Sequence, residues 1–269
     1  MSEPDTADAS LSQEASLVEI FASAQGEGPE VGRTTVFVRF GGCDLRCRWC
    51  DSPGTWRAVS TCRIEEAAGS ERFRECANPV SPGEIADAVD ALVLHPRTWV
   101  SLTGGEPLLQ PRALAALVGE LRRRGRRIYL ETHGLHVEAL DRVVDELDLV
   151  SMDWKLQSDV RVAADSEFEE GFEFDPRHEA FLRVARRAAS VYVKIVLTPN
   201  TDDRELDAVF ECIARVDPAT PVVLQPVTPT GGVDSVPSAT QLLAWLQRAE
   251  SVLGDVRLIP QTHPIYGAL

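Results

Sequence analysis

Residues 36–52, VFVRFGGCDLRCRWCDS, decide the fold that this chain is expected to adopt. They begin within the β-branched and aromatic run TTVFVRF, residues 34–40, which predicts a strand ending at two glycines. The loop that follows holds Cys43, Cys47 and Cys50. Soft thiolates at this close spacing suit zinc or an iron–sulfur cluster. Because the loop offers no fourth cysteine, a cubane cluster bound here would keep one iron open to another ligand.

Six further strands are expected beyond this segment. They lie at residues 98–103, 127–132, 148–154, 191–198, 221–227 and 255–259. Amphipathic helical patterns are found at residues 111–124, 137–146, 178–189, 203–215 and 238–253. Strands that alternate with helices indicate a parallel sheet. The pattern therefore predicts an α/β fold of about six βα units.

The distinctive motifs of the chain follow the ends of these strands. They are the cysteine loop, GGEP at 104–107, ETHG at 131–134, DWK at 153–155 and QPV at 225–227. Parallel sheets of this kind bind ligands at the carboxyl ends of their strands. The motifs are therefore predicted to form one site.

The length of 269 residues fits one α/β barrel domain, expected at 16–269. Residues 1–15 are acidic and polar, and we expect a disordered leader there rather than a secretory signal. Two polar stretches, at about 58–80 and 160–176, are interpreted as insertions. The sequence contains no run of about 18 apolar residues, the length needed to span a membrane, and a cytoplasmic protein is therefore expected.

The charge balance is strongly acidic, with 42 acidic residues against 27 basic ones and a net charge of −15. Such a surface repels phosphates and argues against nucleic acid as a partner. Lys155 and Lys194 are the only lysines, so arginine carries nearly all the positive charge. The composition is similar to that of proteins from salt-loving microbes, although a GC-rich genome would also favour arginine.

Six cysteines in a chain of this kind favour metal binding or catalysis over disulfides. Cys62 and Cys76 lie in the first polar stretch, where a bridge or a metal site is left open. Cys212 stands between Phe210 and Ile213 and is expected to be a small buried hydrophobe.

The cysteine spacing, with Trp49 directly before the last cysteine, resembles the signature of the radical S-adenosylmethionine (SAM) superfamily. The resemblance implies a partial (β/α)6-type radical SAM barrel. It also implies a [4Fe–4S] cluster and a bound SAM that chelates the open iron and yields a 5′-deoxyadenosyl radical. Gly104, Gly105 and Glu106 stand where the superfamily binds the methionine amino group, and a carboxylate can accept a hydrogen bond from an ammonium.

A narrower resemblance is to the 7-carboxy-7-deazaguanine synthase family. It rests on FASAQGEGPEVG, the cysteine loop, LTGGEPLLQ, ETHG, MDWK, LQPV and the terminal PQTHPIYGAL, which occur in that order. The family implies the substrate 6-carboxy-5,6,7,8-tetrahydropterin, contracted to a deazaguanine with loss of ammonia. The product would serve queuosine or archaeosine synthesis, and the sequence leaves both open.

The family pattern implies a set of site residues. For substrate they are Gln25, Gly26, Glu27, Arg39, Thr103 and Leu269, the last through the terminal carboxylate. For SAM they are Gly104, Gly105, Glu106, Ser151, Asp153, Lys155 and Gln225. Ser52 replaces the threonine that holds Mg²⁺ in the family, and a serine hydroxyl is likewise a hard oxygen donor.

Simpler interpretations stand beside these. QGEG at 25–28 is also typical of a polar turn, and Arg39 could pair with a structural acid. A glycyl-radical activase and a non-catalytic zinc or iron–sulfur protein are the alternative functions. The expected partners are the pterin and an electron donor, either a reductase or a flavodoxin or ferredoxin. Monomer and homodimer both remain open.

Overall fold

The computed structural model describes residues 13–169, 171–265 and 267. Residues 1–12 of the expected leader and Leu269 lie outside this part of the chain. The fold already includes the end of the leader range, because Ala15 is buried and exchanges two backbone hydrogen bonds with Val80. None of the described helices is both long enough and apolar enough to cross a membrane.

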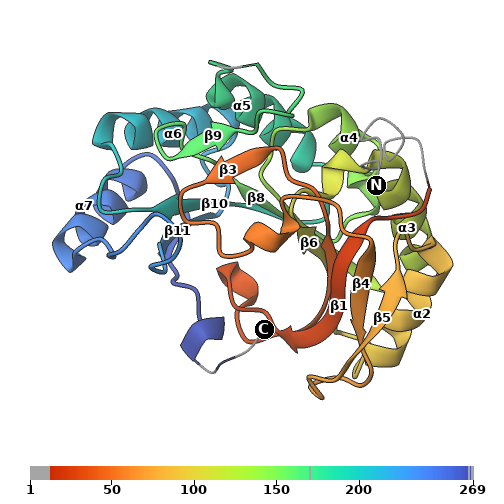
Figure 1. Cartoon of the computed structure of the whole chain (residues 1–269). Coiled ribbons are helices and arrows are strands. Elements are labelled where there is room, and N and C mark those ends of the chain that lie inside the picture. The colour runs from red at the N-terminus through yellow and green to blue at the C-terminus, as the bar shows by residue number, and fades with distance from the viewer. Residues whose placement is uncertain (1–12, 170, 266, 268–269) are drawn as a thin grey trace.

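A ten-stranded sheet forms the centre of the molecule (Figure 1), in the order β12-β11-β10-β8-β7-β6-β2-β1-β4-β5. The neighbours from β12 to β2 run parallel. These strands are β2 (Thr34–Phe40), β6 (Trp99–Gly104), β7 (Arg127–Thr132), β8 (Leu149–Asp153), β10 (Val191–Leu197), β11 (Val222–Pro226) and β12 (Val256–Leu258). The predicted α/β fold with a parallel sheet is confirmed.

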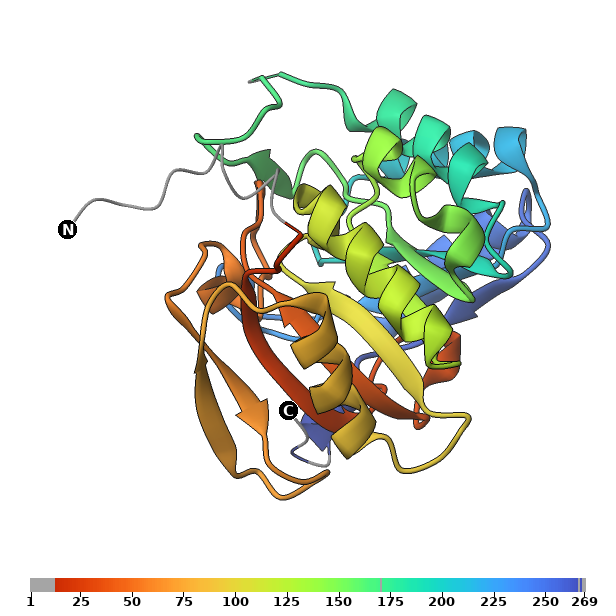
Figure 2. The same cartoon turned by 90° about the vertical axis from the view of Figure 1, so that its right-hand side faces the viewer.

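Helices lie on the outer side of the curved sheet (Figures 1 and 2). They are α2 (Pro82–Leu92), α3 (Pro111–Arg123), α4 (Val137–Asp141), α5 (Phe174–Ala185), α6 (Asp203–Val216) and α7 (Ala239–Glu250), and short 3₁₀ helices include η4 (Val144–Glu146). Each long helix buries one apolar stripe, as Leu114, Leu117 and Leu121 of α3 show. Burial of each such leucine contributes about 1.5–3 kcal/mol, so the stripes fix the helices to the sheet.

The first expected insertion is part of the sheet rather than a loop. Within residues 58–80, β4 (Thr61–Glu65) and β5 (Phe73–Ala77) form a hairpin. It extends the sheet beyond β1 (Leu17–Ala24), which runs antiparallel to β2. Cys62 and Cys76 lie opposite each other in this hairpin, and both are free thiols.

The second expected insertion, 160–176, packs against the cysteine loop. Its strand β9 (Val160–Val162) pairs with β3 (Leu45–Cys47) in a small separate sheet. Helix α5 begins at Phe174, four residues before the predicted start, and Phe174 is buried. Val160 and Phe174, at the two ends of this stretch, belong to the same buried apolar cluster as Leu45 of the cysteine loop.

Two glycines bring the loop after β6 against the cysteine loop. The amide of Gly105 donates to the Phe40 carbonyl at 3.0 Å, and the amide of Glu106 donates to the Gly42 carbonyl at 2.8 Å. A Cβ on Gly105 would lie 2.0 Å from the Gly42 oxygen, and Gly104 has a φ of +122°. Glycine is therefore required here for the contact between two backbones.

We predict that Gly105→Ala destabilises the metal-free chain by about 3 kcal/mol or more, because backbone atoms must move to admit the methyl group. Urea unfolding followed by circular dichroism measures the change. The matched control is Gly119→Ala on α3, where a Cβ meets nothing within 4 Å. That change should stabilise by about 0.5–1 kcal/mol through helix propensity. Equal stability of both variants would contradict the close contact.

Candidate functional site

A cavity of about 360 Å³ lies at the carboxyl ends of the parallel strands. It collects side chains from every motif that the sequence placed at a strand end. The predicted site residues that line it are Gln25, Gly26, Glu27, Arg39, Cys43, Cys47, Cys50, Ser52, Thr103, Gly104, Gly105, Ser151, Asp153, Lys155 and Gln225. Of the predicted set, Glu106 does not line the cavity, and Leu269 lies outside the described residues.

Cys43, Cys47 and Cys50 are free thiols that face this cavity. Burial raises the pKa of the Cys43 thiol to about 12 and also raises the pKa of the Cys47 thiol. These thiols would therefore lose their protons on binding metal.

The spacing of the three sulfur atoms bears on which metal group they fit. Within the described chain, the three cysteines are not a group whose ligand atoms all lie within 4.8 Å of one another. A tetrahedral zinc ion with Zn–S bonds of about 2.3 Å would hold its sulfurs about 3.8 Å apart. The donor set therefore fits a multi-iron cluster better than a single zinc ion.

Gln225 supplies a second sign of a ligand. Its Oε1 atom is buried and has no hydrogen-bond partner among the described residues. Buried amide oxygens are nearly always paired in folded proteins. An N–H group of a bound molecule would satisfy this oxygen, so the residue fits its predicted place beside SAM.

The only two lysines of the chain both line the cavity and flank Asp153. Lys155 Nζ donates to Asp153 Oδ2 at 2.7 Å, and Lys194 Nζ lies 3.1 Å from Asp153 Oδ1. Although burial opposes both charges, Asp153 raises the pKa of Lys155 and Lys194, and the lysines in turn lower the pKa of Asp153. Both lysines are therefore ammonium groups at neutral pH. The sequence did not predict Lys194 as a site residue.

Two acidic side chains, Glu27 and Glu131, line the cavity together with the two lysines. Glu27 accepts from Lys194 Nζ, and Gln261 Nε2 lies 2.5 Å from its Oε1 atom. Glu131 accepts from Gln25 Nε2 at 3.0 Å and from Ser101 Oγ at 2.5 Å. Burial, and then the neighbouring Glu27, raise the pKa of Glu131. Glu131 and Gln261 belong to quoted motifs, but no role was predicted for either.

Arg39 pairs with a structural acid and also lines the cavity, so both roles considered from the sequence can apply to it. Its Nε donates to Glu19 Oε1 at 2.8 Å, and Glu19 also accepts from Arg63 Nη2 at 2.6 Å. The pairing with a structural acid is thus present, yet Arg39 also lines the cavity. Its guanidinium lies 5.6 Å from the centre of the Phe21 ring, and the hydrogen bond and ion pair described for it use Nε rather than the terminal nitrogens. They are available for a carboxylate ligand.

Glu106 does not line the cavity, and the contact of its carboxylate with the methionine ammonium stays a prediction. The side chain is fully buried. Its carboxylate accepts from Thr132 Oγ1 at 2.9 Å and 3.0 Å and from the His133 amide at 2.9 Å. The amide of Leu108 also donates to it, at 3.0 Å. Glu106 therefore joins the loops after β6 and β7, and the two glycines before it form the cavity wall.

Ser52 lies two residues after Cys50, directly beside the carboxylate of Asp51. Its Oγ donates to Asp51 Oδ1 at 2.9 Å, and Gln261 Nε2 lies 3.2 Å from Asp51 Oδ2. Asp51 and Ser52 both line the cavity. A hydroxyl next to a carboxylate is a donor pair that Mg²⁺ accepts.

Comparison with known proteins gives concordant similarities. The Radical SAM superfamily profile matches residues 37–213. A 7-carboxy-7-deazaguanine synthase from Geobacter sulfurreducens is 36% identical, covering 95% of this chain and 98% of that protein. The synthase from Methanopyrus kandleri is 33% identical over 93% of this chain and 92% of its own. The crystal structure of QueE from Escherichia coli shares the fold, with a TM-score of 0.60 and 19% identity over 97% of this chain and 100% of that one.

Proposed function

The chain belongs to the radical SAM superfamily and, within it, to the 7-carboxy-7-deazaguanine synthase family, and we propose that it converts 6-carboxy-5,6,7,8-tetrahydropterin to 7-carboxy-7-deazaguanine with loss of ammonia. The product would be a precursor of queuosine or archaeosine. One observation carries the proposal beyond family membership. Groups suited to a carboxylate and to a guanidine-like edge share one cavity with the three cysteines.

The substrate end of the cavity is charge-matched to the pterin. The terminal nitrogens of Arg39 hold the substrate carboxylate, and its Nε stays on Glu19, which keeps the guanidinium in one orientation. The N–H-rich edge of the pterin donates to the carboxylates of Glu27 and Glu131. Lys194 offsets the negative charge of this pair before substrate enters.

Thiolates of Cys43, Cys47 and Cys50 would hold the [4Fe–4S] cluster, which with SAM supplies a 5′-deoxyadenosyl radical when both are bound. The chain's own residues position SAM beside them. Gly104 and Gly105 line the cavity where they would contact the methionine part of SAM, and Lys155 would offer an ammonium group to its carboxylate. Ser151, Asp153 and Gln225, which line the cavity, would contact the rest of SAM. Thr103, which lines the same cavity, would contact the substrate.

The test is turnover by the anaerobically reconstituted, reduced chain supplied with SAM, Mg²⁺ and the carboxylated pterin, with the deazaguanine measured by absorbance and mass. Arg39→Ala should lower kcat/KM on the order of 100-fold, the equivalent of about 3 kcal/mol in charge-assisted hydrogen bonds. Its iron content and SAM binding should not change.

Arg63→Ala is the matched control, because Arg63 shares Glu19 with Arg39 but does not line the cavity. It should keep the wild-type KM. If the wild-type chain, with its cluster fully reconstituted, forms no product, the proposed reaction is wrong. Wild-type kinetics in Arg39→Ala would place the substrate carboxylate elsewhere.

We extend the proposal to Mg²⁺ at Ser52, supported by the adjacent Asp51 carboxylate. Ser52→Ala should raise the Mg²⁺ concentration for half-maximal rate on the order of tenfold, as expected for the loss of one interaction with a charged group. Ser52→Thr keeps a hydroxyl and should remain near wild type. Rates measured across a Mg²⁺ titration decide this, and an unchanged midpoint in Ser52→Ala would remove Ser52 from the metal site.

An acidic flavodoxin or ferredoxin is proposed as the electron donor. Arg46, Arg48 and Arg161 line a surface hollow beside the cysteine loop together with Asp159, which pairs with Arg48, and Arg48 and Arg161 are exposed. On a chain of net charge −15, this basic group gives an acidic partner a local attraction. Arg161→Glu should slow turnover driven by reduced flavodoxin at low salt but not turnover driven by dithionite, whereas the exposed Arg97→Glu should affect neither. Equal slowing with both reductants would exclude a docking role.

A cytoplasmic location is also proposed. All six cysteines are free, and a reducing compartment would keep them so. The homodimer stays a prediction.

A further inference from the structure

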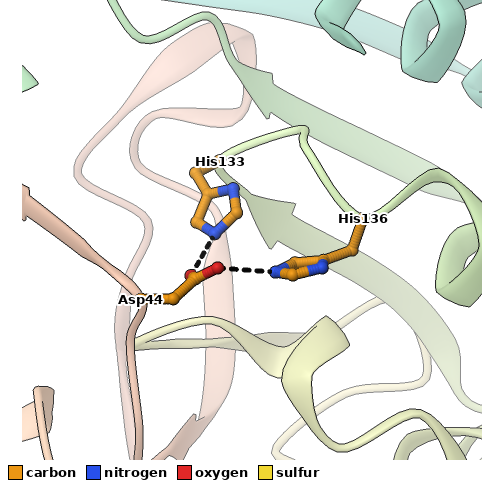
Figure 3. A group of neighbouring side chains, drawn as sticks. All are labelled: Asp44, His133 and His136. Carbon is orange, nitrogen blue, oxygen red and sulfur yellow. Dashed lines mark hydrogen bonds and ion pairs between the residues drawn. The ribbon is translucent and has the colours of Figure 1, made fainter. Parts of the chain in front are cut away.

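Asp44 lies within the cysteine loop, and its carboxylate is held by two imidazoles (Figure 3). Asp44 Oδ1 lies 2.9 Å from His133 Nε2, and Oδ2 lies 3.1 Å from His136 Nε2. All three residues are buried. Figure 3 shows the two rings approaching the carboxylate from different sides, so both of its oxygens are used.

Both histidines come from the segment after β7, and this segment is itself fixed. The His133 amide donates to Glu106, and the His133 carbonyl accepts from His178 Nε2 at 2.9 Å. His136 Nδ1 lies 3.1 Å from Glu167 Oε1 in the loop before α5. Through Asp44, the cysteine loop is thus connected to the ends of β6 and β7 and to α5.

Two buried carboxylates, those of Asp44 and Glu106, lie near His133. Asp44 and Glu106 are buried carboxylates, and His133 Nε2 lies 3.4 Å from Glu106 Oε2 as well as near Asp44. Buried carboxylates require a positive partner. Burial opposes it, yet His133 keeps the pKa of Asp44 well below its usual range, and Glu106 and Asp44 raise the pKa of His133. The imidazole of His133 thus lies between the carboxylates of Asp44 and Glu106.

The same three residues have ligand atoms within 4.8 Å of one another, which a metal ion could also use. Two features favour hydrogen bonding instead. Each imidazole lies at hydrogen-bond distance from a different oxygen of Asp44. His133 Nδ1 is buried without a partner among the described residues, whereas a metal-bound histidine almost always donates its second N–H to an acceptor.

We propose that Asp44 is a positioning residue, which His133 and His136 hold so that the backbone between Cys43 and Cys47 presents its thiolates to the cluster in a fixed place. A flexible loop would present the same cysteines with a larger entropy cost on binding. The inference rests on the cluster being bound by this loop and is independent of the substrate that the cavity takes.

The test uses full-length Asp44→Asn and His136→Gln, reconstituted anaerobically. Both changes preserve side-chain volume, and circular dichroism of the metal-free proteins checks the fold. We expect iron retention against a chelator to weaken about 10-fold or more, the usual cost of losing an outer-shell partner. In Asp44→Asn the midpoint potential of the cluster should also rise, because a buried negative charge beside it is removed. Turnover is not needed for either measurement.

Matched controls are Asp87→Asn on α2 and His95→Gln, which make the same chemical changes at exposed positions away from the cysteine loop. They should retain iron and keep the wild-type potential. Wild-type iron retention and potential in both Asp44→Asn and His136→Gln would overturn the proposal. Equimolar zinc in the isolated chain that is lost in His136→Gln would also overturn it and identify a metal site instead.

Discussion

The contact between the backbones of Gly42 and Gly105 is the constraint on which the site depends. It joins the loop after β2 to the loop after β6 by hydrogen bonds that only the absence of side chains permits. The cysteines and the glycine wall thereby face one cavity. This contact places Glu106 behind the wall, where its carboxylate accepts hydrogen bonds from Thr132 and His133.

Lysine and arginine are used in different places in this protein. Arginine supplies the cations of the surface, where planar guanidinium groups make many ion pairs with Asp and Glu. The chain's two lysines stand beside Asp153, and both bury compact ammonium groups there. A compact ammonium places a full charge in a small volume. The two ammonium groups of a strongly acidic protein thus lie in the cavity, where anionic parts of ligands are expected.

Periodicity predicted the parallel half of the sheet well, and β2 and β7 begin and end where expected, because buried strands give continuous β-branched runs. Helix α2 was missed although Ser81 and Glu84 form a capping box that the sequence displays. Strand β3 is only three residues long and is defined by its pairing with β9, so no local pattern announces it.

The site was predictable wherever a motif carried its own chemistry, as at Cys43, Gln25 and Lys155. Roles created by distant pairing were not predictable. Glu131 becomes a site residue through Gln25, which lies 106 positions away, and Lys194 through Glu27, which lies 167 positions away. The position of the Glu106 side chain depends in the same way on Thr132 and His133, at the end of β7.

The most direct measurement of the shared cavity is a crystal structure of the anaerobically reconstituted chain with SAM and the carboxylated pterin, collected at the iron and zinc absorption edges. We predict an iron signal bounded by Cys43, Cys47 and Cys50, with the pterin carboxylate on the terminal nitrogens of Arg39. A zinc signal at the cysteines, or a pterin bound away from Arg39, would contradict the assignment of cluster and substrate to one cavity.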